Sequence, residues 1–596
     1  MCGIVGLVNG HPVARDIVTA LGRLQYRGYD SGGIAVAGPG FDLRKVVGGI
    51  SLLMDSIGNG FAGQAGIGHT RWATRGHAET RNAHPHIWNG VAVVHNGIIE
   101  NYRSLRDAML ARGETFDSET DSEVIPHLIA AARAAGAAPL DAVRCACAEL
   151  QGDYAIAVLF EDAPDRIVVT RQGSPLMVAR AARTSAVASD PAALAGLCED
   201  FAALEDGDLA ELTTGGVTIY DSDGCPTSRY WRKVDVAEED GLACAYGSFT
   251  RAEIATQPAA LRQTDVRLRD LAIPPSVADA ERLVLIGCGS SLHAAAAARP
   301  WLECLTCIPC DVEAASEYLT REAPLSHCTA GVLVSQSGET GDMLGVMAML
   351  KARRVPLVSV ANVQHSALAR GADLLWPTEA GREQGAGATK SFTCQVLALI
   401  RFGLALGLHR GSVTLETMIA VERELAAVAS VCTRAEAMEA QFEAIAERLI
   451  RFGETLFIGR GSAAAIAAEG ALKLKELPGL RAEACAAGEL QHGPFGMVRE
   501  DTPVIVCAGA GQHADKTLAN AGDVRARGGY VLVLADDATA AAFAPVADDL
   551  VVLPGAGLGT LFAQAVAIQL IAVHAAILLN QPVDRVRGRG KSVAAE

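Results

Sequence analysis

The C-terminal half of the chain repeats itself at a fixed spacing, and this repeat constrains the fold more than any other feature. Ile286-Gly287-Cys288-Gly289-Ser290 is matched by Ile458-Gly459-Arg460-Gly461-Ser462. The same difference in residue number separates Leu333-Val334 from Ile505-Val506, and it is 172 in both cases. Two matches with one spacing indicate duplicated subdomains. Apolar runs at 283–287, 331–335 and 357–360 each precede a helical pattern, which predicts parallel α/β layers.

The N-terminal part of the chain, 1–233, has a different pattern. Short β-like runs, separated by glycine-rich turns, alternate with helical stretches such as 105–112 and 123–133. This mixture predicts an α+β layered fold. Residues 234–247, with Glu238-Glu239 near their centre, break the pattern and predict a linker. We therefore expect domains at 1–233, 248–430 and 431–583, followed by a C-terminal tail at 584–596.

Composition excludes several classes of partner. The chain has 51 basic and 68 acidic residues, a net charge of −17, and no Lys/Arg run, so nucleic acid and anionic membranes are poor candidates. Met1–Gly10 lacks the pattern of a secretory signal. The most apolar window, 561–579, contains Gln564, Gln569 and His574, which favours a buried helix over a membrane span. We expect a cytoplasmic protein.

Fifteen cysteines are scattered along the chain, and a cytoplasmic setting argues against disulfides. Cys304, Cys307 and Cys310 form a C-x-x-C-x-x-C run. A bacterial iron–sulfur run would continue with a fourth Cys at 314, which is Ala. We interpret the three as small apolar core residues and expect neither a metal nor a cofactor.

Cys2 directly follows the initiator Met. Removal of Met1 would leave a thiol and a free α-amine on one residue, and an α-amine titrates near 7.7–8.0, so it could accept the thiol proton. An ordinary buried cysteine is the alternative when Cys2 is considered alone.

Further motifs follow Cys2-Gly3-Ile4-Val5-Gly6 along the chain. They are Tyr26-Arg27-Gly28-Tyr29-Asp30-Ser31, His69-Thr70-Arg71-Trp72-Ala73-Thr74, His95-Asn96-Gly97 and Thr120-Asp121-Ser122-Glu123. In this order they resemble the class II glutamine amidotransferases, whose N-terminal-nucleophile domain hydrolyses glutamine.

The resemblance assigns roles to the residues of these motifs. It implies Cys2 as the nucleophile, with the Asn96 side chain and the N–H of Gly97 as donors to the oxyanion. It implies a glutamine-binding set of Arg71, Trp72, Thr74 and Asp121, in which Arg71 would bind the α-carboxylate and Asp121 the α-ammonium. The residue matching Trp72 gates ammonia channelling in the family. Arg75 stands where the family usually has His.

Two segments of the C-terminal half lie between a strand and a helix, where backbone N–H groups favour a phosphate. The first is Gly287-Cys288-Gly289-Ser290-Ser291, which fails as a dinucleotide motif because Leu292 occupies the third glycine position. The second is Ser335-Gln336-Ser337-Gly338-Glu339-Thr340, for which a capped helix start is the alternative.

These segments resemble the sugar isomerase (SIS) domain, in tandem. With the amidotransferase motifs in front, the whole chain resembles the isomerising glutamine–fructose-6-phosphate aminotransferases. The resemblance implies an N-terminal-nucleophile sandwich followed by tandem α/β SIS domains, in a homodimer. Glutamine and a ketose phosphate, foremost fructose 6-phosphate, would be its substrates. The implied sugar-phosphate contacts are Ser290, Ser291, Ser335, Gln336, Ser337, Thr340, Ala388 and Lys473.

The reaction has chemical needs that four further side chains can meet. His492 could shuttle a proton during ring opening, because an imidazole ordinarily titrates near neutral pH. Lys591 could activate C2 as a Schiff base, and Glu476 could transfer the proton between C1 and C2. Lys473 lies three residues before Glu476, on one helix face, and could tune this carboxylate; a solvated ion pair is the alternative.

Departures from the family pattern lie near the sugar. Ala388 replaces a serine, Leu292 replaces a tyrosine, and Gly588-Arg589-Gly590 replaces Asn-Leu-Ala before Lys591. They leave open a paralogue that aminates another ketose phosphate. A sugar-phosphate-binding regulator is a further alternative, but it leaves the glutaminase motifs and Lys591 unexplained.

Overall fold

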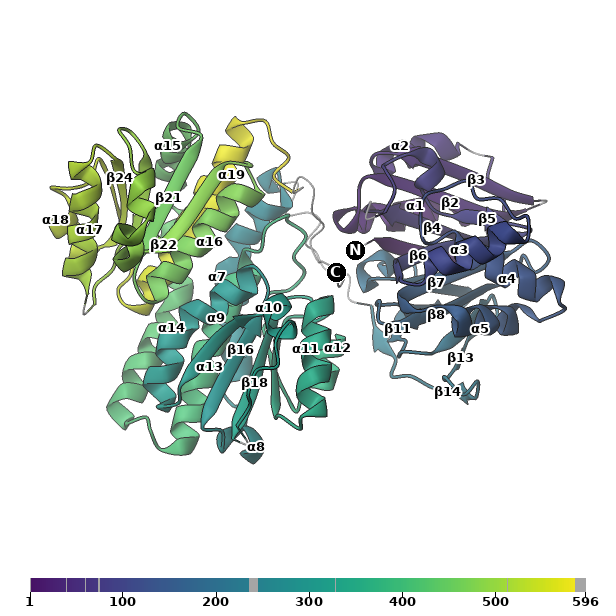
Figure 1. Ribbon diagram of the computed structural model, residues 1–596, viewed down its shortest axis with the longest axis horizontal. Coiled ribbons are helices and arrows are strands. Elements are labelled where there is room, and N and C mark those ends of the chain that lie inside the picture. Colours follow the sequence, from purple (N-terminus) through teal and green to yellow (C-terminus); the bar gives the residue numbers. More distant parts are fainter. Residues whose placement is uncertain are drawn as a thin grey trace. The chain divides into compact units, whose positions relative to one another are not determined.

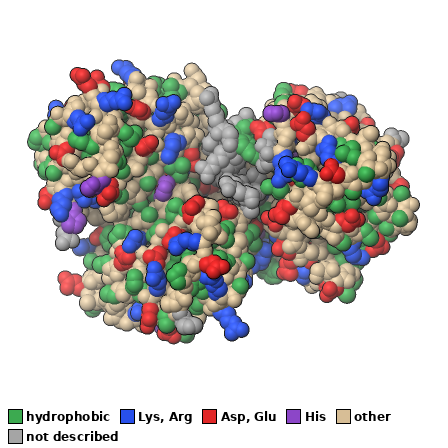
Figure 2. Space-filling model, viewed as in Figure 1, with side chains coloured by type: hydrophobic (Ala, Val, Ile, Leu, Met, Phe, Trp, Pro, Cys, Tyr) green, Lys and Arg blue, Asp and Glu red, His purple; other side chains and the backbone are tan. Residues whose placement is uncertain are grey.

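The structure is a computed structural model that describes residues 2–38, 40–58, 60–72, 75–234, 245–326, 328–511 and 513–584. The chain divides into two compact units (Figure 1). The first contains residues 2–234 and the second residues 245–584. On the face in Figure 2, acidic and basic side chains are interspersed over both units, without a large patch of one sign.

The first unit contains two antiparallel sheets. The eight-stranded sheet has the spatial order β15 (Arg232–Lys233), β11 (Asp200–Ala203), β9 (Met177–Ala181), β10 (Thr184–Ala188), β1 (Gly3–Val8), β4 (Ala65–Arg71), β2 (Ser31–Gly38) and β3 (Gly40–Val47). The seven-stranded sheet has the order β14 (Pro226–Thr227), β13 (Gly216–Tyr220), β12 (Leu209–Thr213), β8 (Ile167–Gln172), β7 (Gly152–Phe160), β6 (Val91–Ile99) and β5 (His86–Trp88).

Successive side chains of a strand point to opposite faces of its sheet, and apolar side chains are buried on both faces of each sheet. In β1, Ile4 and Val8 belong to the core between the two sheets, whereas Val5 and Leu7 belong to the core under α1 (Ala14–Arg23) and α2 (Ile50–Ile57). The outer face of the other sheet is covered by α4 (Val124–Ala134) and α5 (Pro139–Glu149), while α3 (Tyr102–Ala111) follows β6. This four-layer arrangement confirms the predicted α+β sandwich.

The second unit contains two five-stranded parallel sheets of identical topology. One has the order β17 (Cys310–Ala314), β16 (Arg282–Gly287), β18 (Thr329–Ser335), β19 (Leu357–Ala361) and β20 (Leu374–Pro377). The other has the order β22 (Arg481–Ala486), β21 (Glu454–Gly459), β23 (Pro503–Cys507), β24 (Tyr530–Asp536) and β25 (Asp549–Leu553). The strand order reverses beside β16 and beside β21, and ligands bind at the carboxyl ends of strands at such switch points. The tandem α/β prediction is confirmed.

Helices surround these sheets and join them through one continuous core. The helices are α7 (Phe249–Leu268), α8 (Pro275–Ala278), α9 (Ser290–Thr306), α10 (Ala315–Leu319), α11 (Gly341–Ala352), α12 (Ala367–Gly371), α13 (Lys390–Arg410), α14 (Leu415–Glu436), α15 (Glu439–Leu449), α16 (Ser462–Glu476), α17 (Ala514–Ala526), α18 (Asp537–Phe543) and α19 (Leu558–Leu578). At the centre of this core, α9 packs against α13 and α16, and α16 packs against α19.

Among the described residues, α13 and α19 are long and apolar enough to cross a membrane by length and composition. Their most apolar windows are 89% and 83% buried inside the protein, as expected for core helices. The buried helix predicted at 561–579 is therefore present as α19.

The interpretation of the C-x-x-C-x-x-C run as core residues is wrong for two of its three members. Cys310 is buried at the start of β17, but Cys304 and Cys307 are exposed. Cys304 lies on an outward-facing position of α9, and Cys307 ends that helix in the left-handed region at φ +56°. The three-residue spacing crosses a helix end, so the cysteines do not share one environment.

Candidate active sites

The predicted nucleophile lies at the start of β1, where the adjacent strand β4 ends. Gly3 pairs with Thr70, and this register brings the backbone of Trp72 to the half-buried Cys2 side chain. The Trp72 N–H donates to Cys2 Sγ at 3.2 Å. Asn96 Nδ2 donates to the carbonyl oxygen of Cys2 at 2.9 Å. Pairing of β1 with β4 brings Trp72 to Cys2, and Asn96 reaches Cys2 from β6 of the other sheet.

The environment of Cys2 bears on how its thiol could react. Burial raises the pKa of the Cys2 thiol, and the Trp72 N–H and the Arg71 guanidinium oppose this shift only in part. A thiol of raised pKa is protonated near neutral pH and needs a base within reach to become a nucleophile. The α-amine of a chain beginning at Cys2 would be such a base, and this remains a prediction.

Asn96 is held in place by a histidine that the sequence analysis did not select. His69 Nε2 lies 3.0 Å from Asn96 Oδ1, and burial lowers the pKa of His69 to about 3, so the ring is neutral. A protonated Nε2 donating to Oδ1 fixes the carboxamide so that its NH₂ group faces Cys2. The His69 ring stacks on His84, with centroids 4.2 Å apart.

Gly97 has a backbone that only glycine tolerates. Its φ is +129°, and a Cβ at this position would lie 2.0 Å from the carbonyl oxygen of Asp153 on β7. The glycine after Asn96 therefore allows β6 to keep its close pairing with β7 while turning at the predicted oxyanion site.

The two residues predicted to bind the ends of glutamine are both buried. Arg71 donates to the carbonyl oxygens of Arg75, Gly76 and His77, and so holds the loop that follows it. Asp121 accepts the N–H of Ile99 at 2.7 Å, which places its carboxylate beside the end of β6. Thr74, the remaining member of the predicted glutamine-binding set, lies outside the described residues.

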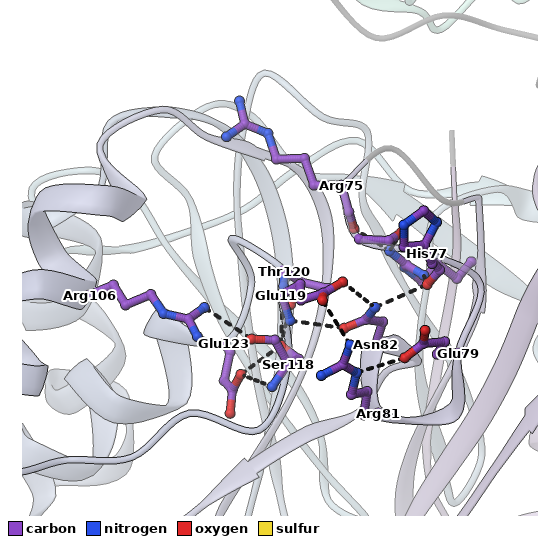
Figure 3. Close-up of polar contacts among 12 residues, drawn as sticks. Arg75, His77, Glu79, Arg81, Asn82, Arg106, Ser118, Glu119, Thr120 and Glu123 are labelled. Carbon is purple, nitrogen blue, oxygen red and sulfur yellow. Dashed lines mark hydrogen bonds and ion pairs between the residues drawn. The ribbon is translucent and has the colours of Figure 1, made fainter.

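A polar network joins the loop after Arg71 to the loop that carries Asp121 (Figure 3). The fully buried Asn82 accepts the N–H of Glu119 at 2.9 Å and donates to the carbonyl oxygen of His77 at 3.1 Å. Arg81 pairs with Glu119 at 2.7 Å. The network fixes the spacing between the predicted binders of the two ends of glutamine.

Arg75, the departure from the usual histidine, has a partner of its own. Its guanidinium lies 4.8 Å from the centroid of the Tyr102 ring. Figure 3 shows its side chain pointing away from the contacts between Asn82 and Glu119. The substitution therefore adds a contact to the start of α3 and leaves the network between the loops intact.

The predicted sugar-phosphate segments lie at the switch point of the first parallel sheet. β16 and β18 are neighbours, with Gly287 opposite Val334, so the segments that follow both strands meet at one edge. Ser335 Oγ accepts the N–H of Gly338 at 3.0 Å, and Ser337 Oγ accepts the N–H of Glu339 at 3.2 Å. Each hydroxyl keeps its own O–H to donate to an anion.

Other members of the predicted set lie around these two serines. Thr340 is the N-cap residue of α11 without a capping bond from its side chain, so the capped-start alternative does not account for its hydroxyl. Gln336 is half-buried in the same loop. The Ser291 hydroxyl is contacted by Gln395 Nε2 at 3.1 Å.

A buried charge cluster adjoins this edge. Lys473 is fully buried, and its Nζ lies 2.5 Å from Glu476 Oε2 and 3.2 Å from Glu469 Oε1. It also donates to Ser290 Oγ at 3.2 Å. Burial lowers the pKa of Lys473, but the two carboxylates more than offset this and raise it above its ordinary value. Because Lys473 is fully buried, the Lys473–Glu476 pair is not a solvated ion pair on the surface.

Glu469 is a site residue that the sequence analysis missed. It accepts a hydrogen bond from Ser290 Oγ and lies 2.8 Å from His293 Nδ1. Burial raises its pKa, but Lys473 and His293 hold the pKa below its ordinary value. Its position four residues before Lys473, on the same helix face as Glu476, could have revealed it.

The 385–390 segment reaches the same cluster. A Cβ on Gly387 would lie 3.1 Å from Lys473 Nζ and 3.2 Å from Glu476 Oε2. Its neighbour Ala388 is half-buried and packs against the shared core. Leu292 is half-buried in the first turn of α9.

Two predicted catalytic residues are not brought to the cluster by the described contacts. His492 is exposed at the end of the short 3-10 helix η4 (Ala487–His492), and within the described ranges no hydrogen bond or ion pair connects it to Lys473 or Glu476. Lys591 lies outside the described residues, as do Gly588 and Gly590.

The sites and folds together define a class of protein, a glutamine amidotransferase domain joined to two SIS domains. The model of the glutamine amidotransferase domain matches residues 69–196, and that of the SIS domain matches residues 276–402 and 449–579.

Relatives that match along the full length of the chain define its family more narrowly than the domain models do. The chain is 38% identical over 610 residues to "Glutamine--fructose-6-phosphate aminotransferase [isomerizing]" of Brucella suis biovar 1, and 37% identical over 613 residues to the Zymomonas mobilis protein of that name. Both matches cover all of both chains. A solved C-terminal domain of glucosamine-fructose-6-phosphate aminotransferase from Francisella tularensis is 31% identical, with a TM-score of 0.55, over 59% of this chain and 100% of that domain. The chain belongs to the isomerizing glutamine–fructose-6-phosphate aminotransferase family.

The Lys473 cluster generates a stability prediction. Lys473→Met would leave the buried Glu469 without its lysine partner, and breaking a buried pair in this way costs about 3–5 kcal/mol. We expect the free energy of unfolding of the second unit to fall by about this amount at neutral pH, measured by urea denaturation. Lys473→Met combined with Glu469→Gln should recover much of the loss. Equal stability of wild type and Lys473→Met would contradict the described cluster.

Proposed function

We propose that this chain transfers the amide nitrogen of glutamine to fructose 6-phosphate and isomerises the product to glucosamine 6-phosphate, releasing glutamate. The observation that carries the proposal is the pair of sites on one chain. One presents Cys2 to Trp72 and Asn96, and the other holds Lys473 between two carboxylates at a switch point. The names of the full-length relatives supply the substrates.

In the first site, the thiolate of Cys2 would attack the amide carbon of glutamine. The oxyanion that forms would receive hydrogen bonds from Asn96 Nδ2 and the Gly97 N–H, and the amide nitrogen would leave as ammonia after gaining a proton. Water would then cleave the thioester, giving glutamate and the free thiol. Arg71 and Asp121 would bind the α-carboxylate and α-ammonium of glutamine.

In the second site, Ser335, Ser337 and Thr340 would bind the phosphate. His492 would assist ring opening, and Lys591 would form an imine at C2 with loss of water. Ammonia would replace the lysine at C2. Glu476 would then take a proton from C1 and return it to C2, which converts the ketose imine to the amino aldose. Lys473, whose Nζ lies 2.5 Å from Glu476 Oε2, would hold this carboxylate in position.

The domains would divide this work, with residues 1–233 as the glutaminase and 248–430 and 431–583 as SIS subdomains. The linker 234–247 and the tail 584–596 would connect and complete the sites, in a cytoplasmic homodimer. Neither a paralogue specific for another ketose phosphate nor a regulator is favoured, because the full-length relatives carry the name of the fructose 6-phosphate enzyme.

Replacing the nucleophile tests the division into two sites. We expect Cys2→Ala to abolish glutamine hydrolysis, because no other group of the site can form the thioester. Formation of glucosamine 6-phosphate from fructose 6-phosphate should persist at high ammonium concentration and high pH, measured by mass spectrometry of the product. A folded Cys2→Ala protein that lacks both activities would contradict the two-site proposal.

Borohydride trapping tests the role of Lys591. Reduction in the presence of fructose 6-phosphate, without glutamine, should add one sugar-phosphate mass to the peptide that contains Lys591, because reduction makes an imine permanent. The adduct should be absent from Lys591→Ala, which should retain glutamine hydrolysis. An adduct at Lys473 or Lys390 instead would refute the assignment.

A further inference from the structure

The second half of the tandem contains a pocket at the place equivalent to the proposed sugar-phosphate site. Its volume is about 270 Å³, and it lies beyond the carboxyl ends of β21 and β23, where the second sheet has its own switch point. Arg460 and Ser462 line it from the segment after β21, and Cys507 from the end of β23. Under the repeat, Ser462 is the counterpart of Ser290, and Cys507 is the counterpart of Ser335.

Helices α9 and α16 contribute to both the first site and this pocket. The helix that begins at one site contributes its middle turns to the other. Ser290 at the start of α9 donates to Glu469 on α16, and Ser462 at the start of α16 donates to the carbonyl oxygen of Ala297 on α9 at 2.7 Å. Glu469 is the counterpart of Ala297, so the two contacts are equivalent under the repeat. The counterpart of Lys473 is Trp301, which lines the second pocket.

This exchange replaces the Lys473–Glu469 pair of the first site by uncharged side chains. Where the first site has the cation of Lys473 and the carboxylate of Glu469, the corresponding positions of α9 carry an indole and a methyl group. Neither can transfer a proton. The pocket therefore has neither the lysine nor the carboxylate of the first site, and His513 is the one histidine among its lining residues.

The pocket nevertheless has groups that suit an anion. Gly461, the N-cap residue of α16, has φ +54° and ψ −128°, nearly identical to the +54° and −125° of Gly289 before α9. The helix start thus faces the pocket in the geometry used by the first site. Arg460 is fixed by its Nη2 contact with Asn520 Oδ1 at 2.9 Å, and its buried Nε has no partner among the described residues.

The buried side-chain amide of Gln564 has an oxygen that could accept a hydrogen bond from a ligand hydroxyl. Gln564 lines the pocket, is fully buried, and donates from Nε2 to the carbonyl oxygens of Ala508 and Leu534 at 2.6 and 3.0 Å. Its Oε1 has no hydrogen-bond partner among the described residues. A buried acceptor without a donor costs about 1–3 kcal/mol. A ligand hydroxyl would satisfy Oε1.

Nearby carboxylates do not occupy the groups that face the pocket. Asp536 accepts from Ala510 N and Thr560 Oγ1 with one oxygen and from Thr539 with the other, so it fixes the loop after β23. Glu424 accepts the N–H of Leu558 and caps α19. The pocket is smaller than the roughly 300–1,000 Å³ of drug-sized sites, which favours a ligand with one sugar ring over a nucleotide sugar.

We propose that this pocket binds a hexose phosphate without converting it. The phosphate binds at Arg460 and the start of α16, a sugar hydroxyl donates to Gln564 Oε1, and the Trp301 indole covers the apolar side of the sugar. The proposal rests on the proposed function only for the choice of fructose 6-phosphate as probe.

Equilibrium dialysis of the full chain with radiolabelled fructose 6-phosphate, without glutamine, tests this inference. We expect two molecules bound per wild-type chain and one per Arg460→Ala chain, with about a tenfold or greater loss of affinity at the second site. Ligand-dependent Trp301 fluorescence, identified by its absence from Trp301→Phe, should be lost in Arg460→Ala. Arg451→Ala removes an exposed arginine and serves as the matched control, with two molecules bound.

Each other outcome overturns the proposal. One molecule bound to both wild type and Arg460→Ala would show that the pocket does not bind the sugar. Competition by inorganic phosphate as strong as by fructose 6-phosphate would show an anion site without recognition of the sugar. Synthesis of glucosamine 6-phosphate is measured separately with the same variants. Absence of this synthesis in the wild-type protein would refute the proposed function. The number of sugar molecules bound per chain separately tests whether the second pocket binds the sugar.

Discussion

The second unit depends on one fully buried lysine. Lys473 has no access to water, so its ammonium must be neutralised inside the protein, and an unpaired buried charge would cost several kcal/mol. Glu469 and Glu476 lie within one turn of it on α16, and Ser290 reaches it from α9. All three of these charged residues lie on α16, and the start of α9 adds hydrogen bonds to them from Ser290 and His293. These contacts join the two halves of the tandem and place the cluster beside the first switch point.

The sequence repeat predicted this tandem correctly, because equal spacing reflects equal topology. The repeat could not predict which residues of one half contact residues of the other half. Ser290 and Glu469 are 179 residues apart, and no periodicity in either segment indicates that they meet. The cysteine run illustrates the opposite error: Cys304, Cys307 and Cys310 have a regular spacing, but α9 ends between Cys304 and Cys307, so the spacing does not correspond to one face.

In the first unit, the motif residues Cys2, Arg71, Asn96 and Asp121 could be selected from the sequence, because their motifs resemble those of the class II glutamine amidotransferases. His69 could not. Its role is to fix Asn96, and this depends on a 3.0 Å contact between two buried side chains that come from different sheets. Burial follows from the pairing of β4 between β1 and β2, a property of the folded sheet. The residues predicted to act on substrate could therefore be chosen from motifs, whereas His69, which positions one of them, could not.

The two switch points of the second unit show how one backbone can carry different chemistry. Both have a glycine of the same conformation before a helix, and both have a serine that bonds to the opposite helix. The buried Lys473 has two carboxylates and a hydroxyl as partners, and the loss of a charged member would leave a buried charge less well neutralised. Trp301 needs no such partners. After a duplication, a half that lost one charged member of the cluster would gain stability by replacing the remaining charged residues with apolar ones. The backbone around Gly461, which we propose binds an anion, would persist because it is part of the fold.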